Sequence, residues 1–343
     1  MKKLAKNAIT IFFLIVGIVA TYVILKEYDI KDILSVYKNF NIWVLLLYAF
    51  VIFSIYFVLT WRWDVILRSR NIKIPFYKLY IYRIIGTSIN FLTPGPRVGG
   101  EPTQANLLSK HGVEFTEGLS TIMIDKIIDT TTSGLLFILG VLLVGVKYSF
   151  PRGTEVILWV FGTIFVVLVV LFYYRMLTNR HFFLNLFRML YLDRVSWLKK
   201  IEGSIEQIEI IMIEFYKHNK KAFLKSLAIS IFIWVVMFFE YTFATRLLGF
   251  HLGVVEMFFI ITFIGIAQLF PIPMAIGVLE AGQISAFALI GLPTAAGVSL
   301  AFLVRFKDIT VAIIGLVLLA MYGFHMKDVV KVVEKKYRNE KKL

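Results

Sequence analysis

A glutamate, a lysine and an aspartate stand at a fixed spacing in the first half of this sequence. Glu101 follows a run of prolines and glycines, and Lys126 and Asp129 come 25 and 28 residues later, within the stretch "DKIID". Ionisable groups inside membrane segments form ion pairs, exchange protons or bind charged ligands. We therefore treat these three side chains as candidates for binding and proton exchange.

The same pattern returns in the second half of the chain. Glu280, Arg305 and Asp308 keep the same two spacings, with the last two in the stretch "VRFKD". Each cation and aspartate are three residues apart, a separation at which side chains on one helix can pair. The two motifs predict an internal repeat. Their ions either hold the repeats together or line a polar cavity for an anionic headgroup.

Both glutamates follow a segment in which prolines and glycines interrupt an apolar run. The residues that break the backbone there are Asn90, Pro94, Pro96, Gly99, Gly100, Pro271, Pro273 and Gly277. Irregular backbone persists at membrane depth only where protein buries it or water fills a cavity. A short helix is expected after each break, one from Pro102 towards Gly112 and one from about Gly277 to about Ile290. The positive ends of both helices would face inward and favour phosphate or carboxylate groups.

The elements that carry these residues are predicted to be membrane helices. Of the 343 residues, 59% are hydrophobic and 17% are charged, whereas soluble domains carry about 25% charged residues. Apolar runs near the length of a bilayer crossing, roughly 17–25 residues, predict an all-α polytopic membrane protein. The six expected crossings are 8–25, 41–61, 118–146, 154–175, 224–246 and 294–322. Two shorter apolar segments, 84–93 and 257–270, run into prolines and predict re-entrant broken helices.

Basic residues predict the orientation of the chain in the cytoplasmic membrane. The net charge is +15, and the basic excess falls in the head, in 62–83, in 175–225 and in the tail. The positive-inside rule places these segments, and both termini, in the cytoplasm. The first break then enters from the cytoplasm and the second from outside, as in inverted-repeat transporters. Topology and attraction to anionic lipids account for the positive charge without nucleic acid. The expected organisation is one integral membrane domain, 1–343, with repeat one at about 41–146, a cytoplasmic linker at about 176–222 and repeat two at about 224–322.

Other features argue against a metal, a cofactor or an enzyme. The sequence has no cysteine, and its five histidines form no H-x₃-H pair. No Walker motif and no adjacent nucleophile and base are present. Arg62 and Arg246 lie near the ends of predicted helices and are expected to be interfacial anchors. Glu240 either snorkels to the interface or lines the cavity.

The motifs resemble those of a known family. "PGPRVGGEPTQANLL", followed by "DKIID", resembles the membrane domain of the lysylphosphatidylglycerol synthase/flippase family. "PIPMAIGVLEAG" and "LVRFKD" resemble its second loop and its arginine-bearing last helix, so the resemblance covers nearly the whole chain. Met274 and Ala275 replace a usual Gly-Gly pair, and Gln104 stands where an arginine is common. A soluble aminoacyl-transferase domain follows in full-length relatives. This chain stops at Leu343, so we expect synthase activity to be absent.

The resemblance implies a flippase-like transporter that moves an anionic or zwitterionic phospholipid across the membrane without ATP hydrolysis. The residues expected to bind the headgroup are Arg97, Glu101, Gln104, Lys126 and Arg305. The carboxylates expected to couple or gate transport are Asp125, Asp129, Glu280 and Asp308. The alternatives are the membrane half of an enzyme that modifies lipid or polyprenyl phosphates, a scaffold for a separate soluble transferase, and a small-solute exchanger. A phosphate-bearing lipid is the expected partner, and a homodimer stays open.

Overall fold

The computed structural model describes residues 41–92, 99–147, 154–194, 199, 201–269 and 277–322. Every regular element in these ranges is a helix, in agreement with the predicted all-α fold. The predicted crossing at 8–25, the prolines of both breaks and Arg97 lie outside the described residues.

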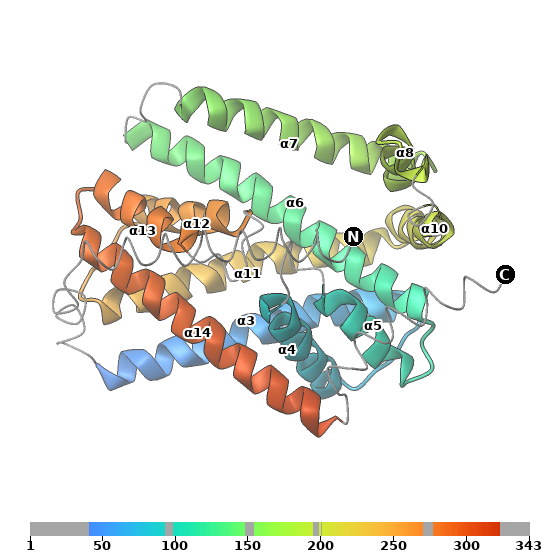
Figure 1. Ribbon diagram of the computed structural model, residues 1–343, viewed down its shortest axis with the longest axis horizontal. Helices are drawn as coiled ribbons and strands as arrows, with labels where there is room; N and C mark the ends of the chain where they lie inside the picture. Colours follow the sequence, from blue (N-terminus) through green and yellow to red (C-terminus); the bar gives the residue numbers. More distant parts are fainter. Residues whose placement is uncertain are drawn as a thin grey trace.

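Two sets of four helices follow each other in the same order (Figure 1). The first set is α3 (Ile42–Ser69), α4 (Phe76–Leu92), α5 (Gly100–Ser109) and α6 (Phe115–Lys147). The second set is α11 (Lys220–Leu247), α12 (Val254–Leu269), α13 (Val278–Leu289) and α14 (Thr294–Met321). Each helix of the second set starts 178 or 179 residues after its counterpart, and Glu280 comes 179 residues after Glu101. This constant offset supports our prediction that the two sets are repeats of one unit.

The packing of the helices has the same two-fold pattern. α3 packs against α11, its own counterpart. Within each set the short helix packs on its neighbours in the chain, α5 on α4 and α6, and α13 on α12 and α14. Between the sets, α4 packs on α14 and α12 packs on α6. Exchanging the sets maps these contacts onto each other, as two-fold related repeats require. The re-entrant course and the inverted orientation stay predictions.

Glycine permits close contacts at both short helices. A Cβ atom on Gly100, at the start of α5, would lie 2.0 Å from the carbonyl oxygen of Gly86 in α4. A Cβ atom on Gly297 in α14 would lie 2.6 Å from the carbonyl oxygen of Gln283 in α13. Both short helices therefore approach a neighbouring backbone to a distance that a side chain would prevent.

Four described helices are long and apolar enough to cross a membrane, namely α3, α6, α11 and α7 (Thr154–Leu177). They correspond to four of the predicted crossings. α14 has 28 residues, but every stretch of 18 residues within it contains the three charged residues Arg305, Lys307 and Asp308. It is therefore not counted among the helices that are apolar enough to cross. α3 continues to Ser69 rather than ending near residue 61, and α4 begins at Phe76 rather than at 84. Hydropathy alone misplaced both ends because Arg62, beyond the first end, and Arg83, before the second, pair with Asp125 inside the protein.

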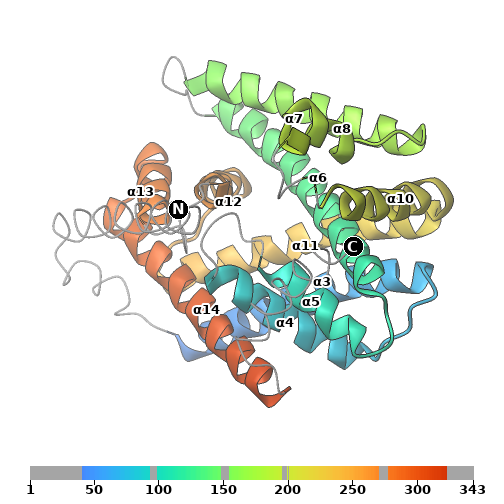
Figure 2. The same cartoon turned by 45° about the vertical axis from the view of Figure 1, so that its right-hand side comes forward.

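The segment between the two sets contains α7, α8 (Phe183–Met189), the 3₁₀ turn η1 (Leu192–Arg194) and α10 (Glu202–His218). α7 lies along α6 at the edge of the molecule, and α8 and α10 lie beyond its end (Figures 1 and 2). The buried carboxylate of Glu209 on α10 accepts hydrogen bonds from the first amides of α8, including that of Phe183 at 2.7 Å. Arg70, just after α3, pairs with Glu214 of α10 at 2.6 Å. The first contact joins α10 to α8 within the linker, and the second joins the linker to the helix bundle.

Candidate functional site

Glu101 and Lys126 form an ion pair between the short helix α5 and the long helix α6. Lys126 Nζ lies 2.5 Å from Glu101 Oε1, which also accepts a hydrogen bond from Asn90 Nδ2 at 3.1 Å. Asn90 Oδ1 in turn accepts from the backbone N–H of Gly100 at 2.6 Å. Asn90, predicted as a break residue, thus ties the end of α4 to the start of α5. The other oxygen, Glu101 Oε2, is buried and has no hydrogen-bond partner in the described part of the chain.

Glu280 and Arg305 form the counterpart of this pair in the second set. Arg305 Nε donates to Glu280 Oε1, and Arg305 Nη2 donates to Glu280 Oε2 at 2.8 Å, so the contact is bidentate. The backbone N–H of Gly277 also donates to Glu280 Oε2, at 2.8 Å. Gly277 has φ +80° and stands directly before α13, a conformation that favours glycine. Charge-assisted, bidentate hydrogen bonds are the strong ones in proteins.

Both pairs therefore join the first turn of a short helix to the middle of the long helix that follows. A negative charge is stabilised at a helix N-terminus by the helix dipole as well as by its cation. In each pair the glutamate is almost wholly buried, whereas the side chain of Lys126 is 44% exposed and that of Arg305 is 12% exposed. The protein's own carboxylates thus occupy both of the helix ends that we predicted would face a phosphate.

The expected pairing of each cation with an aspartate three residues later is wrong. Lys126 contacts Glu101 instead of Asp129, and Arg305 contacts Glu280 instead of Asp308. The short helices bring the glutamates to the cations across 25 residues of chain. That equal spacing was visible in the sequence, but residues far apart in sequence have no fixed distance until the fold is known.

A second buried cluster gathers around Arg62 of α3, whose side chain is only 1% exposed. Arg62 Nε donates to Asp125 at 2.7 Å, and Nη1 donates to Asp129 at 2.6 Å and to Ser230 Oγ of α11 at 2.8 Å. Arg83 of α4 donates from Nη2 to the other oxygen of Asp125 at 2.9 Å. The prediction that Arg62 is an interfacial anchor is wrong, because α3 continues beyond it into the protein.

Neither Arg62 nor Arg83 was among the predicted site residues. Asp125 and Asp129 stand one helical turn apart on an apolar helix, so both need a cation from elsewhere. The two aspartates could therefore have indicated that a buried arginine lies nearby, although the sequence does not say which arginine it is.

Lys307 forms the corresponding cluster in the second set. Its Nζ lies 2.7 Å from Glu240 of α11 and 3.6 Å from Asp308. Glu240 is therefore paired inside the protein rather than extended to the interface. In the first set a cation of α3 faces acids of α6, and in the second an acid of α11 faces a cation of α14. The two halves place ion pairs between the same helices but with the charges exchanged.

Two glutamines stand at matching positions after the glutamates. Gln104 is 5% exposed, and its Nε2 donates to the backbone carbonyl of Tyr82 at 3.3 Å. It packs against Gly86 of α4, so a headgroup could contact its amide only after α5 moves. Gln283 is fully buried, and neither its amide nitrogen nor its amide oxygen has a hydrogen-bond partner among the described residues. Sequence reasoning missed Gln283, although its offset of 179 from Gln104 identifies it.

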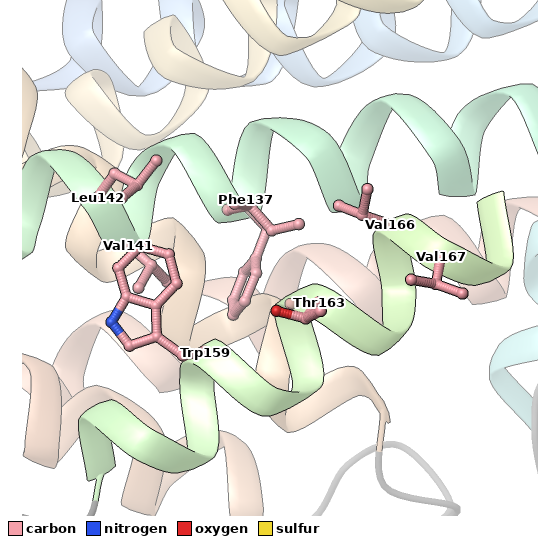
Figure 3. A pocket seen from close by; sticks show the side chains of 9 residues that line it. Phe137, Val141, Leu142, Trp159, Thr163, Val166 and Val167 are labelled. Carbon is pink, nitrogen blue, oxygen red and sulfur yellow. The ribbon is translucent and has the colours of Figure 1, made fainter. Parts of the chain in front are cut away.

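One cavity lies away from these ions. It has a volume of about 220 Å³ and lies between α6 and α7 (Figure 3). Its lining is apolar apart from Thr163, and it includes Phe137, Val141, Trp159 and Val166. Along α6 it begins about two turns after Asp129. This cavity is apolar and lies between α6 and α7, so it is not the polar cavity that we predict beside the breaks.

Groups of three or more acidic or histidine side chains that could hold a metal ion are absent from the described residues. The structure gathers the charged site residues that it describes into four sets. These are Glu101 with Lys126, Glu280 with Arg305, Asp125 and Asp129 with two arginines, and Asp308 with Lys307.

Comparison with known proteins gives a consistent result over the length of the chain. The sequence model of one family, described as the lysylphosphatidylglycerol synthase TM region, matches residues 9–331. A UPF0104 membrane protein of Pyrococcus horikoshii is 24% identical over 310 residues, which is 85% of this chain and 90% of that protein. One of Methanothermobacter thermautotrophicus is 22% identical over 280 residues, which is 78% of this chain and 81% of that protein. No solved structure matches the chain.

Proposed function

Since this chain belongs to the family of lysylphosphatidylglycerol synthase TM regions, we propose that it moves a phospholipid across the cytoplasmic membrane. The lipid would carry an anionic or zwitterionic headgroup with a phosphate, and its movement would not consume ATP. The observation that carries the proposal is the matched pair of bridges, Glu101 with Lys126 and Glu280 with Arg305. Each closes the N-terminal end of a short helix, and each lies at the equivalent place in its half.

In this proposal the glutamates hold the places that the lipid phosphate takes. A phosphate can accept the same two parallel hydrogen bonds from arginine that the Glu280 carboxylate accepts in the structure. It would also be stabilised by the end of α13, as the carboxylate is. A headgroup that replaces Glu280 on Arg305 therefore releases a carboxylate, which must take up a proton or find another cation. Phosphate and carboxylate compete for one site, and this competition couples binding to a rearrangement of the helix.

The two halves would act in alternation. Lys126 is the more exposed cation, so a headgroup can contact it with little movement of α5. Arg305 is nearly buried and requires α13 to move. Broken helices that meet near the midplane from opposite sides of the membrane support alternating access in transporters. The clusters around Arg62 and Lys307, which join the first helix of each set to the last, would stay closed during this exchange.

A lipid translocation assay tests the proposal. Purified protein is reconstituted into vesicles with a trace of fluorescent phospholipid, and an impermeant quencher reports how much label reaches the outer leaflet. We expect the wild-type protein to accelerate exchange, Arg305→Gln to abolish it, and Arg305→Lys to restore part of it. Arg68→Gln is the matched control, because that arginine also pairs with an acid, Asp64 at 2.7 Å, but is 58% exposed and lies outside the proposed site.

Two results would refute the proposal. One is a wild-type protein that moves no lipid across a panel of phosphate headgroups. The other is a folded Arg305→Gln variant that transports at the wild-type rate, which would leave the Glu280 bridge a structural contact only.

A further inference from the structure

The helix α8 is apolar on two opposite sides, although it lies outside the predicted crossings. Leu184 and Phe187 are buried, and Phe183 packs against a cluster that includes Phe172 and Tyr216. On its outward side and in the turn that follows, large apolar side chains are exposed. These are Leu186 at 38%, Met189 at 67%, Leu190 at 56% and Tyr191 at 62%. Asn185 and Arg188 are exposed on the flank between the two sides. A water-facing helix is normally polar on its outer side, so the outward side of α8 needs an apolar environment.

The neighbouring helix α10 shows what a water-facing helix looks like in the same segment. Its inner side is formed by Met212, Phe215 and Tyr216, which are buried. Its exposed side carries Glu206, Gln207, Glu214, Lys217 and His218, with Ile210 as the one large apolar residue among the exposed positions of this helix. The apolar outer side of α8 is therefore a local property and not a general feature of the linker.

The position of α8 places that side at the height of the membrane surface. α7 ends at Leu177 and α8 begins at Phe183, so only five residues separate it from a helix long enough to cross the membrane. Figure 1 shows α8 just beyond the end of α7, at the edge of the molecule. α7 itself exposes apolar side chains along its length, including Val170, Tyr174 and Leu177. The exposed apolar side chains of α8 thus follow those of α7 directly along the chain.

The charges around this side are mostly positive. Arg180, Arg188 and Arg194 are exposed, and the guanidinium of Arg194 lies 4.5 Å from the centre of the Tyr191 ring. Tyrosine and arginine at the end of an apolar surface are typical of the membrane interface. Asp193 is the acidic residue of the turn η1, and it is partly buried.

We propose that α8 and the turn η1 lie in the plane of the membrane and bind the anionic lipids of the cytoplasmic leaflet. Leu186, Met189, Leu190 and Tyr191 enter the boundary between headgroups and acyl chains, and the arginines contact lipid phosphates. Interfacial helices combine buried apolar area with attraction to anionic lipid in this way. This surface is independent of the ion pairs proposed for transport, and it would attach the linker between the two halves to the bilayer.

Single spin labels test the position of α8, because the chain contains no cysteine that would have to be removed. Met189→Cys carries the label on the proposed surface, and Glu206→Cys carries it on the exposed side of α10 as the control. Both full-length variants are reconstituted into vesicles of phosphatidylcholine with phosphatidylglycerol. Collision rates are measured with oxygen, which concentrates in lipid, and with a water-soluble nickel chelate.

We expect the label at 189 to collide mainly with oxygen and the label at 206 mainly with nickel. Equal nickel accessibility at the two positions would overturn the proposal. A label at 189 that is shielded from both reagents would also overturn it, because that result indicates a protein partner or a second copy.

The lipid preference has its own test, in which Arg180→Gln with Arg194→Gln is added to the labelled Met189→Cys protein. These changes should abolish a several-fold difference in the oxygen-to-nickel ratio between vesicles with and without phosphatidylglycerol. The absence of that difference before the change would refute the preference for anionic lipid.

Discussion

Replacing Arg62 by methionine removes the cation at the centre of the largest buried ion cluster. Methionine keeps a similar length of apolar side chain, so the change removes charge and hydrogen bonds rather than packing. Breaking a buried ion pair by removing one partner costs about 3–5 kcal/mol, since the other charge stays buried. Asp125 would retain Arg83 at 2.9 Å, and the side chain of Asp129 is 45% exposed and partly solvated. We therefore expect a loss near the lower limit, about 3 kcal/mol in the free energy of unfolding.

The control for this change is Arg68→Met on the same helix. Arg68 pairs with Asp64 at 2.7 Å, but its side chain is 58% exposed and the pair has i,i+4 spacing. Exposed pairs of this kind contribute about 0.3–0.5 kcal/mol. Unfolding of the purified variants in mixed detergent micelles, followed by circular dichroism, compares the two. Equal unfolding free energies for Arg62→Met and Arg68→Met would show that the buried cluster does not stabilise the fold.

The double variant Arg62→Met/Asp129→Asn separates charge balance from lost contacts. It removes one cation and one anion and leaves Asp125 paired with Arg83. We expect it to be more stable than Arg62→Met alone. A double variant that is less stable would contradict the charge-balance argument.

Four further changes test the packing of the helices and of the linker. Gly297→Ala should destabilise the protein by about 1–3 kcal/mol in the same unfolding assay, because its Cβ would lie 2.6 Å from a backbone oxygen of Gln283. Gly118→Ala should cost less, because its added Cβ meets the flexible end of a leucine at 3.1 Å. Gln283→Leu should leave stability unchanged or raised, because neither amide atom has a partner in the described structure. Glu209→Gln should speed hydrogen exchange of the first amides of α8, which donate to that carboxylate, with a loss of about 1 kcal/mol.

Local signals predicted the short helices well. The sequence predicts a helix from about Gly277 to about Ile290, and α13 occupies Val278–Leu289. Pro102 predicts the first turn of another helix, and α5 occupies Gly100–Ser109. Proline and glycine act on the backbone within a few residues, so their effect is independent of the rest of the fold.

Ion-pair partners could not be predicted in the same way. Spacing on one helix suggested Asp129 for Lys126, but the fold supplies Glu101 from a helix that local rules do not place beside it. Arg62 was assigned to the interface because hydropathy falls at the end of an apolar run. The helix nevertheless continues, since the buried Asp125 and the partly exposed Asp129 on α6 compensate the charge. Such compensation depends on tertiary contacts that hydropathy does not contain.

The repeat was visible from two offsets in the sequence, and the structure extends the same offset to whole helices. Applied to every polar residue, an offset of 179 also relates Gln104 to Gln283, which the sequence analysis did not single out. The exchanged charges of Arg62 and Glu240, in contrast, have no counterpart in sequence identity. The two residues are nevertheless 178 apart, the same offset that relates α3 to α11, so they occupy equivalent positions with opposite charges.

A structure of the protein in a nanodisc that contains anionic phospholipid tests the central claim most directly. The claim is that lipid phosphate and protein carboxylate compete for the same cation. We predict a population in which a lipid phosphate lies within hydrogen-bond distance of Arg305 and the Glu280 carboxylate has turned away. A structure in which both glutamate bridges stay closed in every population, with lipid phosphates only on the outer surface, would contradict it.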